Sequence, residues 1–435
     1  MSKLLLQNAL IIPLDDDSED YYRGDILIRG GVIERIIPRP LAGGAEDVKN
    51  IIDCTNMAVM PGFVNTHGHA SMSLMRGYAD DMPLQSWLED KIWPLEEYLQ
   101  SDDIYWGAQL SIAEMIKGGT TTFTDMYFEM DRVAEAAAES GIRAVLARGL
   151  IGLDSGGEEA LKDTARFIDD WHGEAGGRIN ISLGPHAPYT CPPEFLKKII
   201  ALAEKSGRLV QIHLSETAFE VQECLKQYGV RPPQLLNEAG LLELPVIAAH
   251  CVHLDPDDIS ILAEKRVGVA HNPGSNLKLG SGVAPLCSML EAGIKVGLGT
   301  DGPASNNNLD MVEEMRLASL LAKGIAQDPT LVPAKKALQL ATRGGAEALG
   351  LTGIGQLREG YRADLIGFKL DVPHLIPLHD PLAHLAYAAS AADVDLVIVD
   401  GAILLEKGKL VRVDEDKIRA EATRCAFTLI ERSKK

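Results

Sequence analysis

The stretch Pro61-Gly62-Phe63-Val64-Asn65-Thr66-His67-Gly68-His69 decides how the rest of the chain is interpreted. An apolar, strand-like run from Ala58 to Val64 leads into two histidines that lie two residues apart. On a strand this spacing places both imidazoles on one face. Two imidazoles at the end of a buried strand can bind one metal ion. An isolated pair of this kind is common, so a metal site also requires ligands from downstream residues.

Downstream of this stretch, strand-like and helix-like segments alternate. Eight apolar segments are candidate buried strands: 58–66, 120–125, 142–149, 179–185, 208–213, 246–250, 267–271 and 295–300. Eight strand–helix units over roughly 250 residues match the size of a TIM barrel. A doubly wound open sheet is the alternative, but it usually has fewer strands, and no GxGxxG motif follows any of these segments. The pattern therefore predicts an α/β fold with a (β/α)8 barrel.

The two ends of the chain have a different, all-β pattern. Apolar runs flank Gly30-Gly31 near the start and Asp400-Gly401 near the end, which is a hairpin signal in both places. Each piece is too short to be stable alone, so we expect both to pack together as one small β-sandwich domain formed from both termini. The expected boundaries are 1–57 for its N-terminal part, 58–353 for the metal-dependent barrel with the helices that follow it, and 354–435 for its C-terminal part and a terminal helix.

Composition excludes several classes of function. The chain has 435 residues and a net charge of -20, with no cluster of Lys or Arg that would indicate a nucleic-acid partner. Its six cysteines are scattered without a CxxC pair, which argues against a zinc ribbon and a secreted disulfide framework. The apolar run at the N-terminus is too short for a signal peptide, and no stretch reaches the roughly 18 apolar residues of a membrane helix. We expect a cytoplasmic protein that does not bind membranes.

Polar residues gather at the ends of the predicted strands, where barrel enzymes place their catalytic residues. Seven of the 11 histidines follow or end these segments: His67, His69, His186, His213, His250, His253 and His271. Asp125, Arg148 and Asp301 stand at three further strand ends. Any one of these histidines could be a structural residue that binds a neighbouring loop. The set as a whole predicts one shared site.

These residues resemble a known family. The PGFVNTHGH stretch, the His213-Leu214-Ser215-Glu216 segment, His250 and Thr300-Asp301-Gly302 resemble the amidohydrolase superfamily. Within it, the chain is similar to the 5-methylthioadenosine/S-adenosylhomocysteine deaminases. The further matching motifs are Trp93-Pro94-Leu95-Glu96, Gly118-Gly119-Thr120-Thr121-Thr122, Gly184-Pro185-His186-Ala187-Pro188-Tyr189 and His271-Asn272-Pro273-Gly274-Ser275-Asn276-Leu277-Lys278-Leu279.

The resemblance implies a metal site made of His67, His69, His213 and Asp301. Three imidazoles and one carboxylate suit one divalent ion, and we expect Zn²⁺, although ligand type leaves iron and manganese open. Some members of the superfamily hold two metals bridged by a carboxylated lysine at the end of the fourth strand. Residues 178–186 contain no lysine, so one metal is expected. The alternative for Asp301 is a turn residue before Gly302.

The resemblance also implies the chemistry. A metal-bound hydroxide would attack C6 of an adenine ring, because the metal lowers the pKa of its water to about 7. Glu216 would shuttle a proton to the ring, His250 would orient the hydroxide by a hydrogen bond, and Asp301 would take the water proton while it stays a ligand. Glu216 could instead be a favourable charge at the start of a helix.

Three residues are expected to contact the substrate in addition to Glu216. By resemblance, Glu96 accepts hydrogen bonds from both ribose hydroxyls, since a carboxylate offers two acceptor oxygens; an exposed helix-end glutamate is the alternative. Arg148 and His186 would meet the substrate from neighbouring strands, although Arg148 could equally pair with an acidic neighbour such as Asp125. Trp87 and Trp93 could stack on the purine or pack in the core.

The leading hypothesis is therefore hydrolytic deamination of 5-methylthioadenosine and S-adenosylhomocysteine. The small-molecule partner is then an adenine thio-nucleoside, and a homo-oligomer is the general prior for such enzymes. Another amidohydrolase activity is the alternative, such as an adenosine, guanine or cytosine deaminase or a triazine hydrolase. A non-catalytic barrel scaffold is the remote alternative, and it would be expected to have lost metal ligands.

Overall fold

Eight parallel strands form the centre of the protein. The computed structural model describes residues 3–38, 48–153 and 156–434. The strands follow chain order around the sheet, and each lies beside the next. Their bounds are β6 (Phe63–Asn65), β7 (Thr120–Tyr127), β8 (Arg143–Leu150), β9 (Ile179–Pro185), β10 (Val210–Leu214), β11 (Val246–His250), β12 (Gly268–His271) and β13 (Val296–Leu298). Nearly every residue of these strands is buried, as expected of a parallel sheet covered on both faces.

Hydrogen bonds between the first and last strands close the ring. The backbone N–H of Thr66, just after β6, donates to the carbonyl of Leu298 in β13 at 2.9 Å, and its hydroxyl donates to the same oxygen at 2.8 Å. The side-chain oxygen of Asn65 accepts the N–H of Thr300 at 3.0 Å. The predicted (β/α)8 barrel is confirmed.

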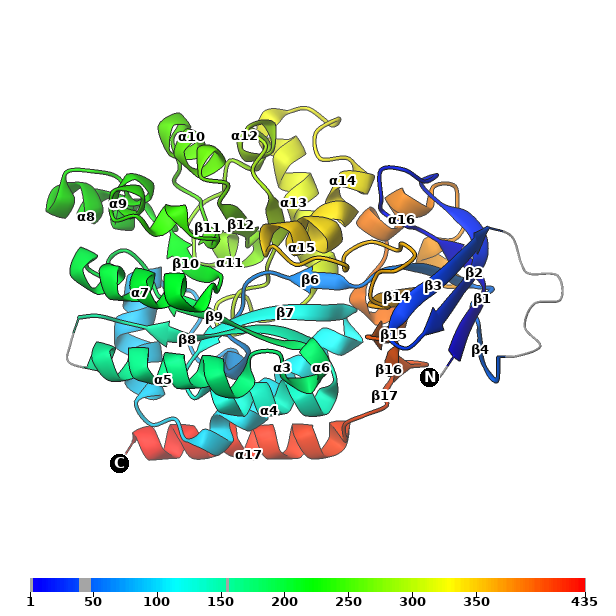
Figure 1. Cartoon of the computed structure of the whole chain (residues 1–435), viewed down its shortest axis with the longest axis horizontal. Helices are drawn as coiled ribbons and strands as arrows, with labels where there is room; N and C mark the ends of the chain where they lie inside the picture. The colour runs from blue at the N-terminus through cyan, green and yellow to red at the C-terminus, as the bar shows by residue number, and fades with distance from the viewer. Residues whose placement is uncertain (1–2, 39–47, 154–155, 435) are drawn as a thin grey trace.

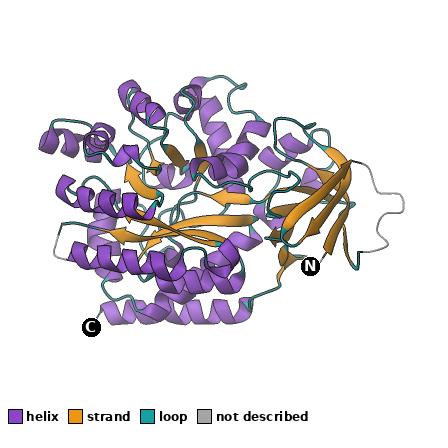
Figure 2. Ribbon diagram, viewed as in Figure 1, coloured by secondary structure: helices purple, strands orange, loops and turns teal. Residues whose placement is uncertain are grey.

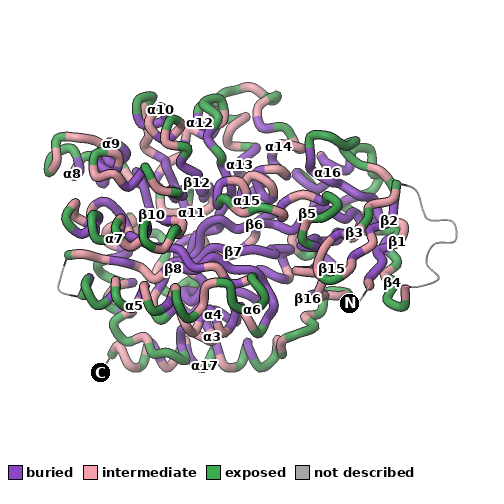
Figure 3. The backbone as a smooth tube through the Cα atoms, viewed as in Figure 1, coloured by how far each residue is buried: buried purple, intermediate pink, exposed green. Residues whose placement is uncertain are grey.

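Helices surround the strands and complete the barrel. Figure 2 shows them packed around the orange strands, and Figure 3 shows that the strands are buried while the outer faces of the helices are exposed. The longer ones are α3 (Ser101–Lys117), α4 (Met130–Ser140), α5 (Gly156–Trp171), α7 (Pro193–Ser206), α8 (Ala218–Tyr228), α10 (Pro256–Glu264) and α13 (Met311–Ala326). Shorter ones are α1 (Leu84–Trp87), α2 (Trp93–Glu96), α6 (Glu174–Gly177), α9 (Pro232–Glu238), α11 (Pro273–Lys278), α12 (Leu286–Glu291), α14 (Ala334–Gln339), α15 (Gly345–Ala348) and α16 (Pro381–Tyr387). Among the described residues, no helix combines the length and apolar composition of a membrane span.

Both ends of the chain meet in a second sheet beside the barrel (Figure 1). Its N-terminal strands are β1 (Lys3–Ile11), β2 (Tyr22–Arg29), β3 (Val32–Pro38), β4 (Asn50–Asp53) and β5 (Met57–Pro61), and its C-terminal strands are β14 (Leu365–Lys369), β15 (Val394–Val399), β16 (Ala402–Glu406) and β17 (Lys409–Leu410). The expected hairpins are present as the antiparallel pairs β2–β3 and β15–β16. The ends therefore pack together as predicted, in one mixed sheet to which the described residues contribute nine strands, with its own apolar core. The last helix, α17 (Glu415–Ser433), returns along the barrel beside α3.

The predicted strand 58–66 is wrong in one respect, because the structure divides it at Gly62. The segment before Gly62 is β5 of the terminal sheet, and the segment after it is β6 of the barrel. The N–H of Gly62 still donates to the carbonyl of Asp364, just before β14 of the terminal sheet. The N–H of Phe63 donates to the carbonyl of Gly119, just before β7 of the barrel. A side chain at position 62 would lie 2.1 Å from Thr121, so the crossing requires glycine.

Candidate metal centre and active site

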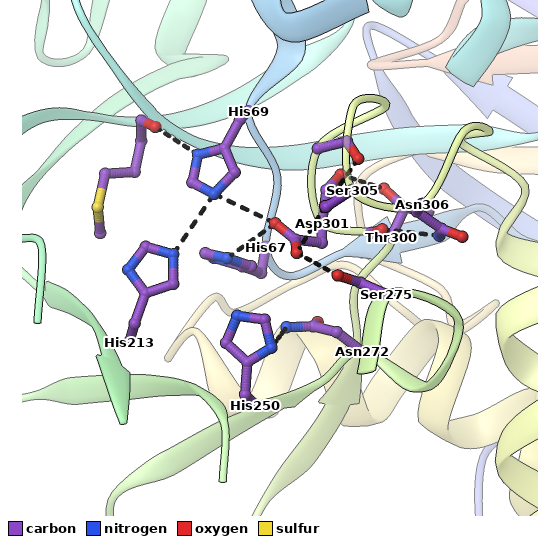
Figure 4. Close-up of polar contacts among 12 residues, drawn as sticks. His67, His69, His213, His250, Asn272, Ser275, Thr300, Asp301, Ser305 and Asn306 are labelled. Atoms are coloured by element: carbon purple, nitrogen blue, oxygen red, sulfur yellow. Dashed lines mark hydrogen bonds and ion pairs between the residues drawn. The ribbon is translucent and has the colours of Figure 1, made fainter. Parts of the chain in front are cut away.

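Four of the predicted ligands converge at the ends of three strands (Figure 4). His67 and His69 follow β6, His213 lies in β10, and Asp301 follows β13. The Nε2 atoms of His69 and His213 are 3.4 Å apart. Asp301 Oδ1 lies 3.2 Å from His69 Nε2 and 3.5 Å from His67 Nε2.

These spacings fit a tetrahedral metal ion. Ligand atoms about 2.0–2.1 Å from a tetrahedral Zn²⁺ lie about 3.3 Å from one another, which is the range of distances found here. His67 Nε2 is buried and has no hydrogen-bond partner among the described residues. A buried polar atom without a partner is costly, and a metal ion at the centre of this group would satisfy it.

Hydrogen bonds behind two imidazoles orient their free nitrogens toward the centre. His69 Nδ1 donates to the carbonyl of Met126 at 2.6 Å, and His213 Nδ1 donates to the carbonyl of His186 at 2.7 Å. A histidine that donates from Nδ1 keeps its Nε2 lone pair for a metal. In their neutral form, both rings therefore present Nε2 to a metal at the centre of the group.

Asp301 is held in a similar way. Its Oδ2 accepts hydrogen bonds from the hydroxyls of Ser275 at 2.6 Å and Ser305 at 2.9 Å, so Oδ1 faces the imidazoles. Asp301 also has a left-handed backbone, with φ of 60°. Strained conformations of non-glycine residues gather at functional sites. The burial of Asp301 and its contacts with two imidazoles, rather than its backbone, argue against a simple Asp-Gly turn.

Glu216 and His250 stand beside the ligands. His250 Nε2 lies 3.8 Å from Glu216 Oε2, and His250 Nδ1 is held by the side chain of Asn276 at 2.8 Å. The hydroxyl of Ser281 donates to Glu216 Oε1 at 3.4 Å. Burial raises the pKa of Glu216 above its usual value. This carboxyl therefore holds a proton more readily than an exposed glutamate does, which suits a group that transfers protons.

The metal centre opens into a concave pocket. Pockets with a mostly apolar lining and a few polar groups are typical of small-ligand sites. Glu96, His186, Glu216, His250 and Asp301 contribute polar groups to its lining. Apolar and aromatic side chains make up most of the rest, with Trp87, Trp93, Phe128, Tyr189 and Leu279 among them. The predicted substrate-contacting residues Glu96 and His186 thus share one cavity with the predicted catalytic residues.

Glu96 enters the pocket from the segment that follows β6. The hydroxyl of Tyr127, at the end of β7, donates to Glu96 Oε1 at 2.5 Å. Burial raises the pKa of Glu96 to about 7, although this hydrogen bond lowers it. The alternative of an exposed helix-end glutamate is therefore wrong: the carboxyl is enclosed and faces the cavity.

Arg148 is placed differently from the expectation. Its Nη1 donates to Asp163 of α5 at 3.0 Å, and among the described residues it does not line the pocket. The alternative of an ion pair therefore holds, with Asp163 rather than Asp125 as the partner. His271, one of the seven histidines at the predicted strand ends, is buried but lies outside the pocket lining.

Sequence reasoning missed the residues that hold the site together. Ser275 and Asn276 belong to the HNPGSNLKL segment, which resembles the family as a whole but gives neither residue a role by pattern alone. Ser305 follows Asp301 by four residues, and Tyr127 follows Asp125 by two on β7. The alternation of side chains along β7 could have indicated Tyr127, whereas the serine contacts depend on loop geometry that has no simple pattern.

The chain matches the amidohydrolase family over residues 58–404. A protein of Pelotomaculum thermopropionicum named 5-methylthioadenosine/S-adenosylhomocysteine deaminase is 52% identical over 432 residues, which cover 99% of this chain and 100% of the relative. A protein of the same name from Desulforudis audaxviator is 51% identical over 430 residues, 99% of each chain.

Solved structures agree with this relationship. An adenosine deaminase from Xanthomonas campestris with bound zinc superposes with a TM-score of 0.94 at 34% identity, covering 99% of each chain. Atrazine chlorohydrolase from Arthrobacter aurescens, complexed with zinc, gives a TM-score of 0.90 at 28% identity over 97% of this chain and all of that one. The chain therefore belongs to the amidohydrolase family and, within it, to the 5-methylthioadenosine/S-adenosylhomocysteine deaminases.

Proposed function

We propose that the protein deaminates 5-methylthioadenosine and S-adenosylhomocysteine by hydrolysis, with one bound Zn²⁺. Water supplies the oxygen that replaces the C6 amine of the adenine, and the amine leaves as ammonia. The convergence of His67, His69, His213 and Asp301 beside Glu216 supports this proposal most strongly. The relatives that share the deaminase name at about 50% identity support the choice of substrate.

The chain's own residues divide the proton transfers among them. His67, His69, His213 and Asp301 would hold a divalent ion, which would lower the pKa of a water molecule and supply a nucleophile at neutral pH. Glu216 would take the first proton of the water and carry it to the purine ring, and His250 would donate a hydrogen bond that fixes the direction of attack. Asp301 would accept the second proton and pass it to the departing amine, which leaves as ammonia. The hydroxyls of Ser275 and Ser305 continue to donate hydrogen bonds to Asp301 Oδ2 during the reaction and so keep the carboxylate in place.

The remaining pocket suits a nucleoside. Glu96 offers carboxylate oxygens to the 2′ and 3′ hydroxyls of the ribose, His186 contacts the nucleoside from the end of β9, and the aromatic side chains accept the purine and the 5′-thio group. A contact between Arg148 and the carboxylate of a homocysteine tail stays a prediction, and it would require Arg148 to leave Asp163.

A substrate panel tests the proposal. Zinc-loaded protein is expected to release ammonia from 5-methylthioadenosine and S-adenosylhomocysteine with the highest kcat/KM, from adenosine more slowly, and not from guanine or cytosine. Glu96→Gln is expected to raise the KM for all three nucleosides about tenfold or more, because a hydrogen bond to a charged group contributes about 1.5–3 kcal/mol. Activity on a free base alone would contradict the nucleoside assignment, and an unchanged KM in E96Q would contradict the role of Glu96.

Metal binding is expected to be stoichiometric and to depend on pH. Burial lowers the pKa of His69, but the hydrogen bond and charge of Asp301 raise it to about 9 in the metal-free protein. His69 is then protonated at pH 7 and must lose its proton to become a ligand. Zinc affinity should therefore rise about tenfold per pH unit between pH 6 and 8, because one proton is released per ion.

Titration of chelator-treated protein with zinc at several pH values measures this dependence. We expect one tightly bound ion per chain, lost in His69→Gln and retained in the control His379→Gln, because His379 is exposed and lies outside the site. Two tightly bound ions would contradict the single-metal proposal. An affinity that does not depend on pH would contradict the release of a proton from His69.

Three statements stay predictions. Metal analysis can test whether zinc is the native ion, light scattering can test the homo-oligomeric state, and cell fractionation can test the cytoplasmic location.

A further inference from the structure

The turn after β10 places Glu216 in an unusual way. On a regular strand, a residue three positions after His213 would point to the opposite face. Ser215 interrupts the strand with a left-handed backbone, φ of 50°, and Glu216 reaches the same pocket as His213. Such a conformation costs a non-glycine residue about 1 kcal/mol or more and persists only when the surroundings hold it.

One buried carboxylate holds this turn. Glu220 Oε1 accepts the backbone N–H of Ser215 at 2.8 Å, and Glu220 Oε2 accepts the backbone N–H of Glu216 at 2.9 Å. Glu220 is only 4% exposed. The carboxylate thus spans two consecutive N–H groups, and both of its oxygens are required.

The carbonyl side of the same turn is held by residues that follow β11. The N–H of Cys251 donates to the carbonyl of Leu214 at 3.0 Å, and the N–H of His253 donates to the carbonyl of Ser215 at 2.9 Å. The backbone between the metal ligand His213 and Glu216 is therefore fixed on both sides, with Glu220 as its side-chain anchor.

Helix capping alone does not explain this contact. Thr217 is the N-cap of α8, and its hydroxyl accepts the N–H of Glu220 at 3.1 Å. In an ordinary capping box, the side chain three residues after the N-cap bonds the N–H of the N-cap itself. Glu220 occupies that position but bonds the two residues before Thr217 instead. Its target is the segment that carries Glu216.

We propose that Glu220 is a positioning residue that holds Glu216 over the metal centre. This inference rests on the proposed role of Glu216 as the proton shuttle. A misplacement of about 1 Å at a reacting group can reduce the rate about 100-fold. Glutamine at position 220 has one acceptor oxygen and would present an N–H₂ donor to one of the two N–H donors, which would release the turn.

The test compares Glu220→Gln with Thr217→Ala in zinc-loaded protein. E220Q is expected to lower kcat about 10- to 100-fold, with KM changed less than about twofold and one zinc per chain retained. T217A removes a hydrogen bond from the same helix end and is the matched control: its Tm should fall, and its kcat should stay within about twofold of wild type. Equal losses of kcat in both variants would overturn the proposal and leave Glu220 a helix cap.

A double variant separates this inference from the proposed function. Adding E220Q to Glu216→Gln should reduce kcat no further, because the group being positioned is already inactive. If the loss of kcat in the double variant equals the product of the losses in the two single variants, the proposed role of Glu220 is overturned. Normal turnover in E216Q alone would instead refute the role of Glu216. If E220Q aggregates, Glu220→Asp replaces it in the test, because aspartate keeps the charge but is one methylene shorter. This variant is expected to lower kcat while KM changes little. An unchanged kcat in E220D would overturn the proposal.

Discussion

Replacing Glu216 by glutamine is expected to reduce kcat about 1,000-fold, because a positioned general acid–base group contributes about 10²–10⁴ to the rate. Glutamine has the same shape but cannot carry a proton. Burial raises the pKa of Glu216, which suits a group that takes and gives a proton in each turnover. Among the described residues, Glu216 forms no hydrogen bond to the four metal ligands, so zinc content should stay at one per chain.

The measurement pairs ammonia release with metal analysis on the same preparations. Glu223→Gln is the control: Glu223 lies on the helix that follows Glu216 and forms a surface ion pair with Lys226, so kcat should not change. Two results would contradict the prediction for Glu216. Near-normal turnover would remove it from the mechanism, and loss of zinc would make it a structural support of the metal site.

The barrel and most of its site are predictable from the sequence because both depend on patterns that are local. Apolar runs indicate the strands, and seven of the eight correspond to strands of the structure within three residues at each end. Parallel strands bring their carboxyl ends together. His67, His213 and Asp301 can therefore be grouped although 234 residues separate the first from the last. The same rule places His250 beside them, whereas Glu216 reaches them through the turn at Ser215.

The strand at 58–66 shows where local patterns fail. Its apolar run is continuous, yet Gly62 divides it between two sheets. The division depends on Thr121, which leaves no space for a side chain at position 62, and on Asp364, which accepts the N–H of Gly62. Both partners are distant in the sequence, so the run alone could not reveal the crossing.

Arg148 shows the same limit for a site residue. Its position near the end of β8 correctly places it near the mouth of the barrel, but the direction of a long side chain depends on its charged neighbours. Asp163 lies on α5, and no pattern in the sequence connects that helix with Arg148, yet it holds the guanidinium at 3.0 Å. The contacts of Ser275 and Ser305 with Asp301 are unpredictable for a related reason, because hydroxyls bond whatever the loops bring near them.

The junction between the barrel and the terminal sheet contains a buried ion pair with a large expected effect on stability. Arg143, the first residue of β8, donates from Nε and Nη2 to Asp364 at 2.8 and 3.2 Å. Their side chains are 8% and 1% exposed. Asp364 also accepts the N–H of Asp400 at 2.7 Å, so the pair connects the barrel to β14 and β15.

Asp364→Ala is expected to destabilise the protein by about 3–5 kcal/mol, because it leaves the buried Arg143 charge with only the more distant carboxylate of Asp400, at 3.9 Å. Urea denaturation measures the loss, with Asp170→Ala as the control. Asp170 forms an exposed pair with Arg166, and removing such a pair costs about 0–1 kcal/mol.

Replacing both buried partners, as in Arg143→Met with Asp364→Leu, should recover most of the stability, since apolar residues leave no unpaired charge. Arg143 lies at the opposite end of β8 from the pocket, so kcat of the folded D364A protein should stay near wild type. A loss no larger than that of D170A would show that the junction is held by its apolar contacts instead.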